Sequence, residues 1–145
     1  MIAFVQSCWH RDIVDRSRDG FAAALTDVGP TVEYHELPGA FELPLHTRLL
    51  ADTGRYVAVA VAGLVVDGGI YRHEFVASAV IDGLMRVQLE TNVPVFSGVL
   101  TPQHFDERDE TQLAFFMTHM YEKGIELAHA CRATLAARKA LVSPG

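Results

Sequence analysis

The stretch VAVAVAGLVVDGGIYRHEFV, residues 57–76, begins with the pattern of a strand and ends with that of a helix. Residues 57–66 are almost entirely Val, Ala and Leu, the composition of a strand that is covered on both faces. Asp67 and two glycines interrupt this run, and from Arg72 onward apolar residues recur at helical spacing. A buried strand that passes through glycines into a helix indicates a parallel α/β sheet.

The same alternation recurs along the chain. Further β-rich runs lie at 2–6, 31–37 and 93–100, and helical spacing marks 12–28, 41–52, 72–91 and 108–140. The apolar positions that recur along a helix are Val14, Phe21, Leu25 and Val28 in the first, Phe41, Leu45 and Leu49 in the second, and Val76, Val80, Leu84 and Val87 in the third. Gly124 predicts a break in the last helix. The connections are short, so we predict one domain, residues 1–145, with helices on both faces of the sheet.

Composition excludes several classes of protein. The chain has 145 residues, 50% of them hydrophobic and 21% charged, which is typical of a globular domain. A net charge of −6 without a basic run argues against nucleic-acid binding. The longest apolar run, 57–66, is about half of the ~20 residues that a membrane-spanning helix needs, and no secretory signal is present. Cys8 and Cys131 form no metal or disulfide pattern, which favours the reducing cytoplasm. Together with the absence of a long apolar run, this predicts a soluble, cytoplasmic protein.

Four loops follow the four predicted strands. They are SCWHRD (7–12), PGAFE (38–42), DGGIYR (67–72) and TPQHFDERD (101–109). Because the carboxyl ends of parallel strands meet at one edge of the sheet, we expect these loops to converge on a ligand. The first loop contains Trp9, the only tryptophan of the chain. Trp9 would stack on an aromatic ligand, or else it is a packing residue.

The glycine loop has two interpretations. It lacks the spacing of dinucleotide-binding and P-loop motifs. Gly68 and Gly69 allow a ligand to approach the backbone, and the following helix start, with Arg72, favours an anion. The alternative is a tight turn with a solvated arginine.

The second loop and the histidines are also open to more than one interpretation. In PGAFE the backbone of Ala40 and Phe41 would bind a flat heterocycle and Glu42 would accept hydrogen bonds from hydroxyls; the alternative is an ordinary helix start. The seven histidines lack HxH or HExxH spacing, so no metal site is expected.

Taken in order, these motifs resemble the lumazine synthase family, whose members catalyse the penultimate step of riboflavin biosynthesis. The resemblance rests on Trp9 and on motifs that span essentially the whole chain, namely LPGAFELPL (37–45), VVDGGIYRHEFV (65–76), VPVFSGVLT (93–101) and EKGIELAHA (122–130). IYRHEFV, the tryptophan and the HF after TP resemble the second-type synthases of rhizobial and related bacteria. The resemblance implies a flavodoxin-like fold with three α/β/α layers around a four-stranded parallel sheet.

The resemblance also implies an activity and an assembly. The chain would be a transferase that condenses 5-amino-6-(D-ribitylamino)uracil with 3,4-dihydroxy-2-butanone 4-phosphate to 6,7-dimethyl-8-ribityllumazine, releasing phosphate and water without a cofactor. It would form a homopentamer or a decamer of two pentamers, with active sites between neighbouring subunits. The sequence begins at the first predicted strand, so the contacts that an N-terminal extension makes in many members are not expected.

Site residues are carried over by position. Trp9 would stack on the pyrimidine and Glu42 would bind the ribityl chain. The other residues implied to bind substrate are Gly39, Ala40 and Phe41 at the pyrimidine, Val65, Val66 and Ser97 along the pocket, Gly68, Gly69 and Ile70 at the phosphate, and His119 and Lys123 on the last helix.

Several positions depart from the family pattern, among them Ser97, where an aromatic is more usual, and Asp67, where an arginine is common. Arg72 stands where the family has its proton-donating histidine, and an arginine side chain is a poor proton donor near neutral pH. Histidine is the residue type suited to proton transfer near neutral pH, but His73 would point about 100° away from Arg72 on a helix. Both are therefore the catalytic candidates. The family's phosphate-binding arginine has no clear counterpart in 108–123, where Thr118 and His119 are the candidate replacements. These departures keep a rival interpretation open, a catalytically weak flavin- or lumazine-binding protein, and a flavodoxin-like FMN protein is a further rival.

Overall fold

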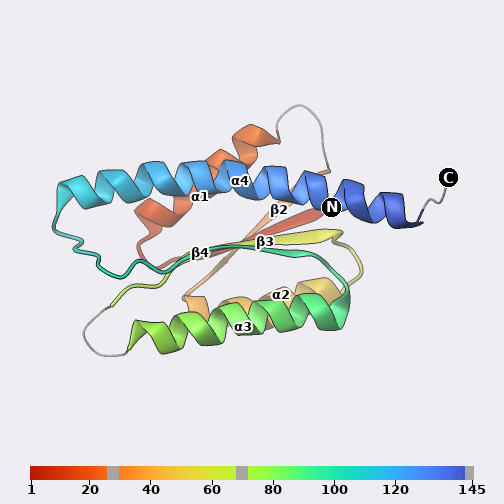
Figure 1. Cartoon of the computed structure of the whole chain (residues 1–145), viewed down its shortest axis with the longest axis horizontal. Coiled ribbons are helices and arrows are strands. Elements are labelled where there is room, and N and C mark those ends of the chain that lie inside the picture. Colours follow the sequence, from red (N-terminus) through yellow and green to blue (C-terminus); the bar gives the residue numbers. More distant parts are fainter. Residues whose placement is uncertain (26–29, 68–71, 143–145) are drawn as a thin grey trace.

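The computed structural model has a parallel sheet between two layers of helices (Figure 1). It describes residues 1–25, 30–67 and 72–142. In chain order the elements are β1 (Ile2–Ser7), α1 (Arg11–Ala24), β2 (Val32–Leu37), the 3₁₀ turn η1 (Ala40–Glu42), α2 (Leu43–Asp52), β3 (Ala58–Leu64), α3 (His73–Thr91), β4 (Val95–Leu100) and α4 (Glu110–Val142). The predicted α/β/α layering is confirmed. The end of the predicted helix 12–28, including Val28, lies outside the described residues.

The four strands pair in the order β2-β1-β3-β4, and each pair is parallel. Ile2 of β1 is in register with Val32 on one side and with Ala58 on the other. The two central strands, β1 and β3, are buried along their whole length, as the Val/Ala composition of β3 predicts. The order reverses beside β1, so the loops at its carboxyl end flank a crevice.

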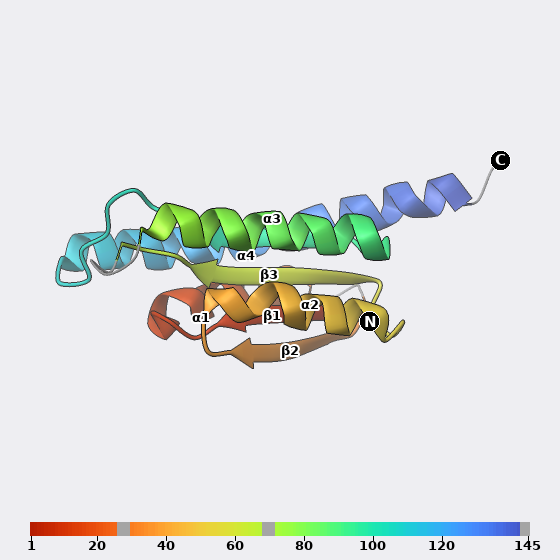
Figure 2. The same ribbon diagram turned by 90° about the horizontal axis from the view of Figure 1, so that it is seen from below.

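Two hydrophobic clusters hold the helices to the sheet. Figure 2 shows the strands from the side of α2 and α3, with α4 behind them. Successive residues of β1 point to opposite faces, so Phe4 packs under α1 and α4, while Val5 packs under α2 and α3. The ring of Phe4 contacts that of Phe21 of α1 at a centroid distance of 5.0 Å. Val80 and Leu84 of α3 are buried on the other face, as their helical spacing predicts.

The predicted helix break at Gly124 is wrong, because α4 is continuous through that residue. The reason for the glycine is close packing against α1. A Cβ atom on Gly124 would lie 2.0 Å from the carbonyl oxygen of Ser17, and one on Gly20 would lie 2.0 Å from the carbonyl oxygen of Tyr121. The backbones of α1 and α4 therefore touch where side chains are absent, and tertiary packing outweighs the low helix propensity of glycine.

The apolar positions Phe41, Leu45 and Leu49 form a stripe that faces away from the sheet. Leu45 is 67% exposed and Leu49 is 55% exposed. The buried positions of α2 are instead Leu43, Thr47, Leu50 and Ala51. The spacing thus predicts the helix correctly, but the apolar stripe is not the face that packs on the sheet. We call Phe41, Leu45 and Leu49 the α2 stripe.

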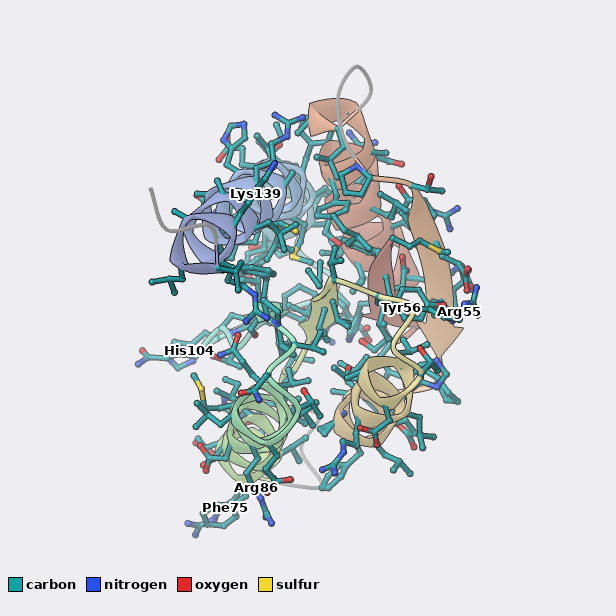
Figure 3. All side chains as sticks on the ribbon, turned by 90° about the vertical axis from the view of Figure 1, so that its right-hand side faces the viewer. Arg55, Tyr56, Phe75, Arg86, His104 and Lys139 are labelled. Carbon is teal, nitrogen blue, oxygen red and sulfur yellow. The ribbon has the colours of Figure 1, made fainter. Side chains whose placement is uncertain are left out.

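Polar side chains cluster along the edge strand β2. The hydroxyl of Tyr56 donates to Oε1 of Glu33 at 2.7 Å, and Arg55 Nη2 lies 3.3 Å from Glu33 Oε2 (Figure 3). The ring of His35 lies 5.3 Å from that of His46 on α2. The Nε2 atom of His46 is buried without a hydrogen-bond partner among the described residues. Burial first, and the neighbouring His35 second, lower the pKa of His46.

We expect His46 to make stability depend on pH. Because its folded-state pKa lies below the unfolded value of about 6.5, the unfolded chain binds this proton more strongly. The free energy of unfolding should therefore fall as the pH is lowered through 6.5 toward the folded-state pKa. Urea titrations between pH 8 and pH 5 measure this slope. His46→Gln should reduce it, whereas the exposed-site change His129→Gln should leave it unchanged; equal slopes in all three proteins would contradict the prediction.

Candidate active site

A pocket of about 550 Å³ opens at the carboxyl ends of β1, β2 and β3. Its lining is mostly apolar and comes from three loops that the sequence predicts to converge. The described lining residues are Trp9, Pro38, Gly39, Ala40, Phe41, Glu42, Leu64, Val65, Val66, His73 and Val76. An apolar cleft with a few polar groups is the usual form of a small-molecule site.

Trp9 forms one wall of the pocket from the loop between β1 and α1. It is 63% exposed, so the alternative that it is a packing residue does not hold within the chain. The next residue, His10, adopts the left-handed conformation with φ 52° and ψ 51° and precedes α1. Its carbonyl oxygen accepts hydrogen bonds from the amides of Ile13 and Val14. This sharp entry into α1 leaves the broad indole face available to a flat ring.

A second wall of the pocket is the turn between β2 and α2. The amide of Glu42 donates to the carbonyl oxygen of Gly39 at 3.3 Å, which closes the 3₁₀ turn Ala40–Glu42. A Cβ atom on Gly39 would lie only 3.1 Å from Oε2 of Glu42. Glycine at this position therefore leaves room for the carboxylate at the pocket. Phe41 contributes to the pocket and also begins the exposed α2 stripe.

The two catalytic candidates lie at the start of α3 and point in different directions. His73 is the first residue of the helix, its side chain is 12% exposed, and it lines the pocket. Arg72 precedes the helix and is exposed, with its guanidinium 5.7 Å from the ring centroid of Phe75. Phe75 lies on the side of α3 that faces away from the sheet (Figure 3). Among the described residues that line the pocket, Arg72 does not appear.

Three predicted residues lie elsewhere in the chain. Ser97 of β4 and His119 of α4 are exposed, and Lys123 of α4 forms an ion pair with Glu126 at 3.3 Å. None of them lines the pocket. His119 and Lys123 lie two turns and one turn before Leu127, on the same side of α4. The Cδ1 atom of Leu127 would lie 2.7 Å from a Cβ on Gly98, so that side of α4 faces β4. Ser97 shares the α2/α3 face of β4 with Val95 and Val99, whereas His119 and Lys123 lie on α4, over the other face of the sheet.

The ring of His119 stacks on that of Phe115, with centroids 5.8 Å apart and planes 11° apart. Phe115 is 61% exposed, so this aromatic pair projects from α4. We call Ser97, Phe115, His119 and Lys123 the β4/α4 group.

Gly68, Gly69 and Ile70, the predicted phosphate loop, lie outside the described residues. The sequence motifs did not single out Pro38, Leu64 and Val76 as site residues, although they line the pocket. Leu64 ends β3 directly before Val65 and Val66, so its position in the sequence was a usable signal. In the described part of the chain, no helix is long and apolar enough to cross a membrane. Within the same residues, no group of three His, Cys, Asp or Glu side chains is arranged to hold a metal ion.

Comparisons with known proteins agree with the sequence motifs. A sequence model of the family described as 6,7-dimethyl-8-ribityllumazine synthase matches residues 1–139. The 6,7-dimethyl-8-ribityllumazine synthase of Rhodococcus erythropolis is 62% identical over 143 residues, which cover 97% of this chain and 92% of the relative. The 6,7-dimethyl-8-ribityllumazine synthase 2 of Pseudomonas syringae pv. tomato is 56% identical over 137 residues, which cover 92% of this chain and 80% of the relative. The synthase 2 of Bradyrhizobium diazoefficiens is also 56% identical, over 139 residues that cover 92% of this chain and 81% of the relative.

Proposed function

This chain belongs to the 6,7-dimethyl-8-ribityllumazine synthase family, and we propose that it condenses 5-amino-6-(D-ribitylamino)uracil with 3,4-dihydroxy-2-butanone 4-phosphate. The observation that carries this proposal is the meeting of Trp9, the Ala40–Glu42 turn and His73 at one pocket. The products are 6,7-dimethyl-8-ribityllumazine, phosphate and water. Residues 1–145 act as one domain, and the free thiols of Cys8 and Cys131 support a reducing, cytoplasmic location.

The pyrimidine fits between the two walls of the pocket. The exposed indole of Trp9 provides a stacking surface, and the backbone of Ala40 and Phe41 provides hydrogen-bonding groups for the ring edge. The Glu42 carboxylate accepts hydrogen bonds from the ribityl hydroxyls. Val65 and Val66, which follow β3 at the pocket, exclude water from the reacting atoms.

His73 is positioned to transfer protons in the pocket. The 5-amino group of the pyrimidine attacks the ketone, and the resulting carbinolamine hydroxyl must be protonated before it leaves as water. Phosphate is then eliminated, and ring closure releases a second water. Histidine is the side chain whose ordinary pKa suits both giving and taking a proton near neutral pH. His73 lines the pocket, whereas Arg72 is exposed, and an arginine side chain is a poor proton shuttle.

Arg72 suits the phosphate of the second substrate. It directly precedes α3, whose first-turn amides and dipole favour an anion. The permanent charge of its guanidinium adds to this field. In this proposal Gly68, Gly69 and Ile70 hold the phosphate with Arg72, and His73 acts on the carbon skeleton next to it.

The β4/α4 group completes the site of a neighbouring subunit. One chain supplies the Trp9 wall, the Ala40–Glu42 turn and His73, and the next copy supplies Ser97, His119 and Lys123. Two observations support a homo-oligomer, either a pentamer or a dimer of pentamers. The β4/α4 group faces outward without lining its own pocket, and the α2 stripe is an exposed apolar surface that continues from Phe41 of the pocket.

Assembly should therefore depend on the α2 stripe. Leu45→Glu places a charge on this stripe, and burying an unpaired carboxylate against a second copy is strongly unfavourable. We expect sedimentation velocity to give a smaller species and turnover to fall with it. The matched control is Leu141→Glu near the end of α4, where the leucine is 85% exposed. A Leu45→Glu protein that keeps the wild-type mass would contradict this surface.

The activity is tested by mixing the protein with both substrates and following the absorbance and fluorescence of the lumazine product. Turnover above the uncatalysed rate supports the enzyme. Quenching of Trp9 fluorescence by 6,7-dimethyl-8-ribityllumazine reports binding separately, because Trp9 is the only tryptophan. Binding without turnover would favour a lumazine-binding protein. The absence of both binding and turnover would overturn the proposed function.

A further inference from the structure

Two residues that follow Trp9 anchor its loop without lining the pocket, and we propose that His10 and Arg11 are positioning residues that hold the indole against the bound pyrimidine. The inference rests on the proposed function, which assigns the pyrimidine to Trp9. Because the indole is largely exposed, the side chains around it do not fix it by burial. Its direction is set by the backbone of the loop and by whatever holds that backbone.

Arg11, the first residue of α1, ties the end of the loop to the sheet. Its Nη2 donates to Oε1 of Glu36, near the end of β2, and its Nε lies 3.6 Å from Oδ2 of Asp15. Asp15 in turn accepts a hydrogen bond of 2.7 Å from Nε2 of Gln6, which is 1% exposed in β1. Glu36 precedes the turn that forms the second wall of the pocket, beginning at Gly39. The Arg11–Glu36 pair therefore links the two loops that enclose the proposed pyrimidine position.

His10 anchors the other side of the same loop. Its ring packs against that of Phe105 in an edge-to-face arrangement, with centroids 5.1 Å apart. Its Nδ1 lies 3.8 Å from Oε2 of Glu107. Both partners belong to the loop between β4 and α4. His10 is a non-glycine residue in the left-handed conformation, which persists only where the surrounding structure determines it. Such residues gather at functional sites.

The two anchoring residues connect the loop to different elements: Arg11 contacts β2, and His10 contacts the β4–α4 loop. Trp9 directly precedes the two anchoring residues, and its ring lies 6.4 Å from that of His10 and nearly perpendicular to it. Each contact is a partly exposed surface contact, so each contributes little to global stability. Their effect is to fix the indole before the ligand arrives, which removes part of the ordering cost of binding.

The test uses the full-length protein and two single changes, Arg11→Gln and His10→Asn. Asparagine tolerates the left-handed conformation, so His10→Asn removes the ring while keeping the backbone geometry. Quenching of Trp9 fluorescence by 6,7-dimethyl-8-ribityllumazine gives Kd, and time-resolved fluorescence anisotropy of the free protein gives the motion of the indole. We expect Kd to rise by about three- to tenfold in each variant, with faster local depolarisation. The KM for the butanone phosphate and the urea midpoint should not change.

Three further proteins distinguish positioning from a general effect. Arg16→Gln breaks a comparable surface pair on α1, with Asp19 at 3.2 Å, and should match the wild type in Kd and anisotropy. Arg11→Lys keeps the charge and should recover most of the affinity. Arg11→Gln combined with Glu36→Gln should be no weaker than Arg11→Gln alone, because the two residues act as a pair.

Unchanged anisotropy in the two anchor variants would overturn the inference, as would an equal rise in the KM for both substrates. The failure of the proposed function has a different signature. In that case the wild-type protein itself would bind no lumazine, while the anisotropy of the variants would still report whether His10 and Arg11 restrain Trp9.

Discussion

Gly124→Ala is expected to destabilise the fold by at least about 3 kcal/mol, at or above the upper end of the usual cost of overpacking a core. The added Cβ would lie 2.0 Å from the carbonyl oxygen of Ser17 and 2.8 Å from the amide nitrogen of Phe21. Both are backbone atoms of α1, so no change of side-chain rotamer relieves the contact. The helices must separate, and the aromatic packing of Phe21 on Phe4 is loosened with them.

Gly83→Ala in α3 is the matched control. It makes the same chemical change inside a helix, and both changes gain about 1 kcal/mol of helix propensity. The nearest atoms to its added Cβ are Cβ and Cγ of Pro44, at 3.0 and 3.1 Å. A shift of a few tenths of an ångström in α2 relieves that contact. Its free energy of unfolding should therefore change by less than about 1 kcal/mol.

Urea unfolding at fixed protein concentration, followed by circular dichroism, measures both variants. Equal stabilities for Gly124→Ala and Gly83→Ala would contradict the close backbone contact between α1 and α4. Gly20→Ala probes the same contact from the other helix, since its Cβ would meet the carbonyl oxygen of Tyr121 at 2.0 Å. Once either change has separated the helices, the second should cost less than it does alone.

The sheet could be predicted from the sequence because its signals are local. The Val/Ala run of residues 57–66 can be buried on both faces only in the centre of a sheet, and β3 lies there. Strand and helix ends were predicted to within a few residues. The role of Gly124 could not be predicted in the same way, because its reason is a contact with Ser17, more than a hundred residues earlier in the chain.

The α2 stripe shows a second limit of periodicity. Leu45 and Leu49 recur at helical spacing just as Val80 and Leu84 do in α3. The pattern indicates that one side of a helix is apolar. It does not indicate whether that side packs on the sheet of its own chain or on another surface. For α3 the repeated positions are buried, and for α2 they are exposed.

Part of the site could be predicted from the sequence, because strand topology brings its loops together. Trp9, the Ala40–Glu42 turn and His73 come from loops whose convergence follows from parallel strand topology, and they do line one pocket. The sequence-based prediction that Arg72 and His73 point in different directions assumed that both lie on the helix, but Arg72 is extended and precedes α3. Helix geometry also did not predict which of them faces the pocket. That choice depends on where α3 begins relative to the end of β3, which is a property of the folded chain.

His73→Gln is expected to lower kcat by about 100-fold or more, within the range that a positioned general acid–base contributes. Glutamine keeps a polar side chain of similar length but gives up no proton near neutral pH. Product binding, measured by quenching of Trp9 fluorescence, should change by no more than a few fold, because His73 contributes little of the stacking surface. Steady-state assays across pH 5 to 9 should show that the variant loses a limb of the wild-type pH profile of kcat.

Arg72→Gln is the adjacent comparison and should behave differently. Because Arg72 is proposed to hold the phosphate and does not line the pocket where the carbon skeleton reacts, its loss should raise the KM for the butanone phosphate more than it lowers kcat. If Arg72→Gln instead lost kcat and the pH limb while His73→Gln kept both, the proton donor would not be the histidine that lines the pocket. The acid–base group would then have to come from the neighbouring subunit, and His119 of the β4/α4 group would be the histidine to replace next.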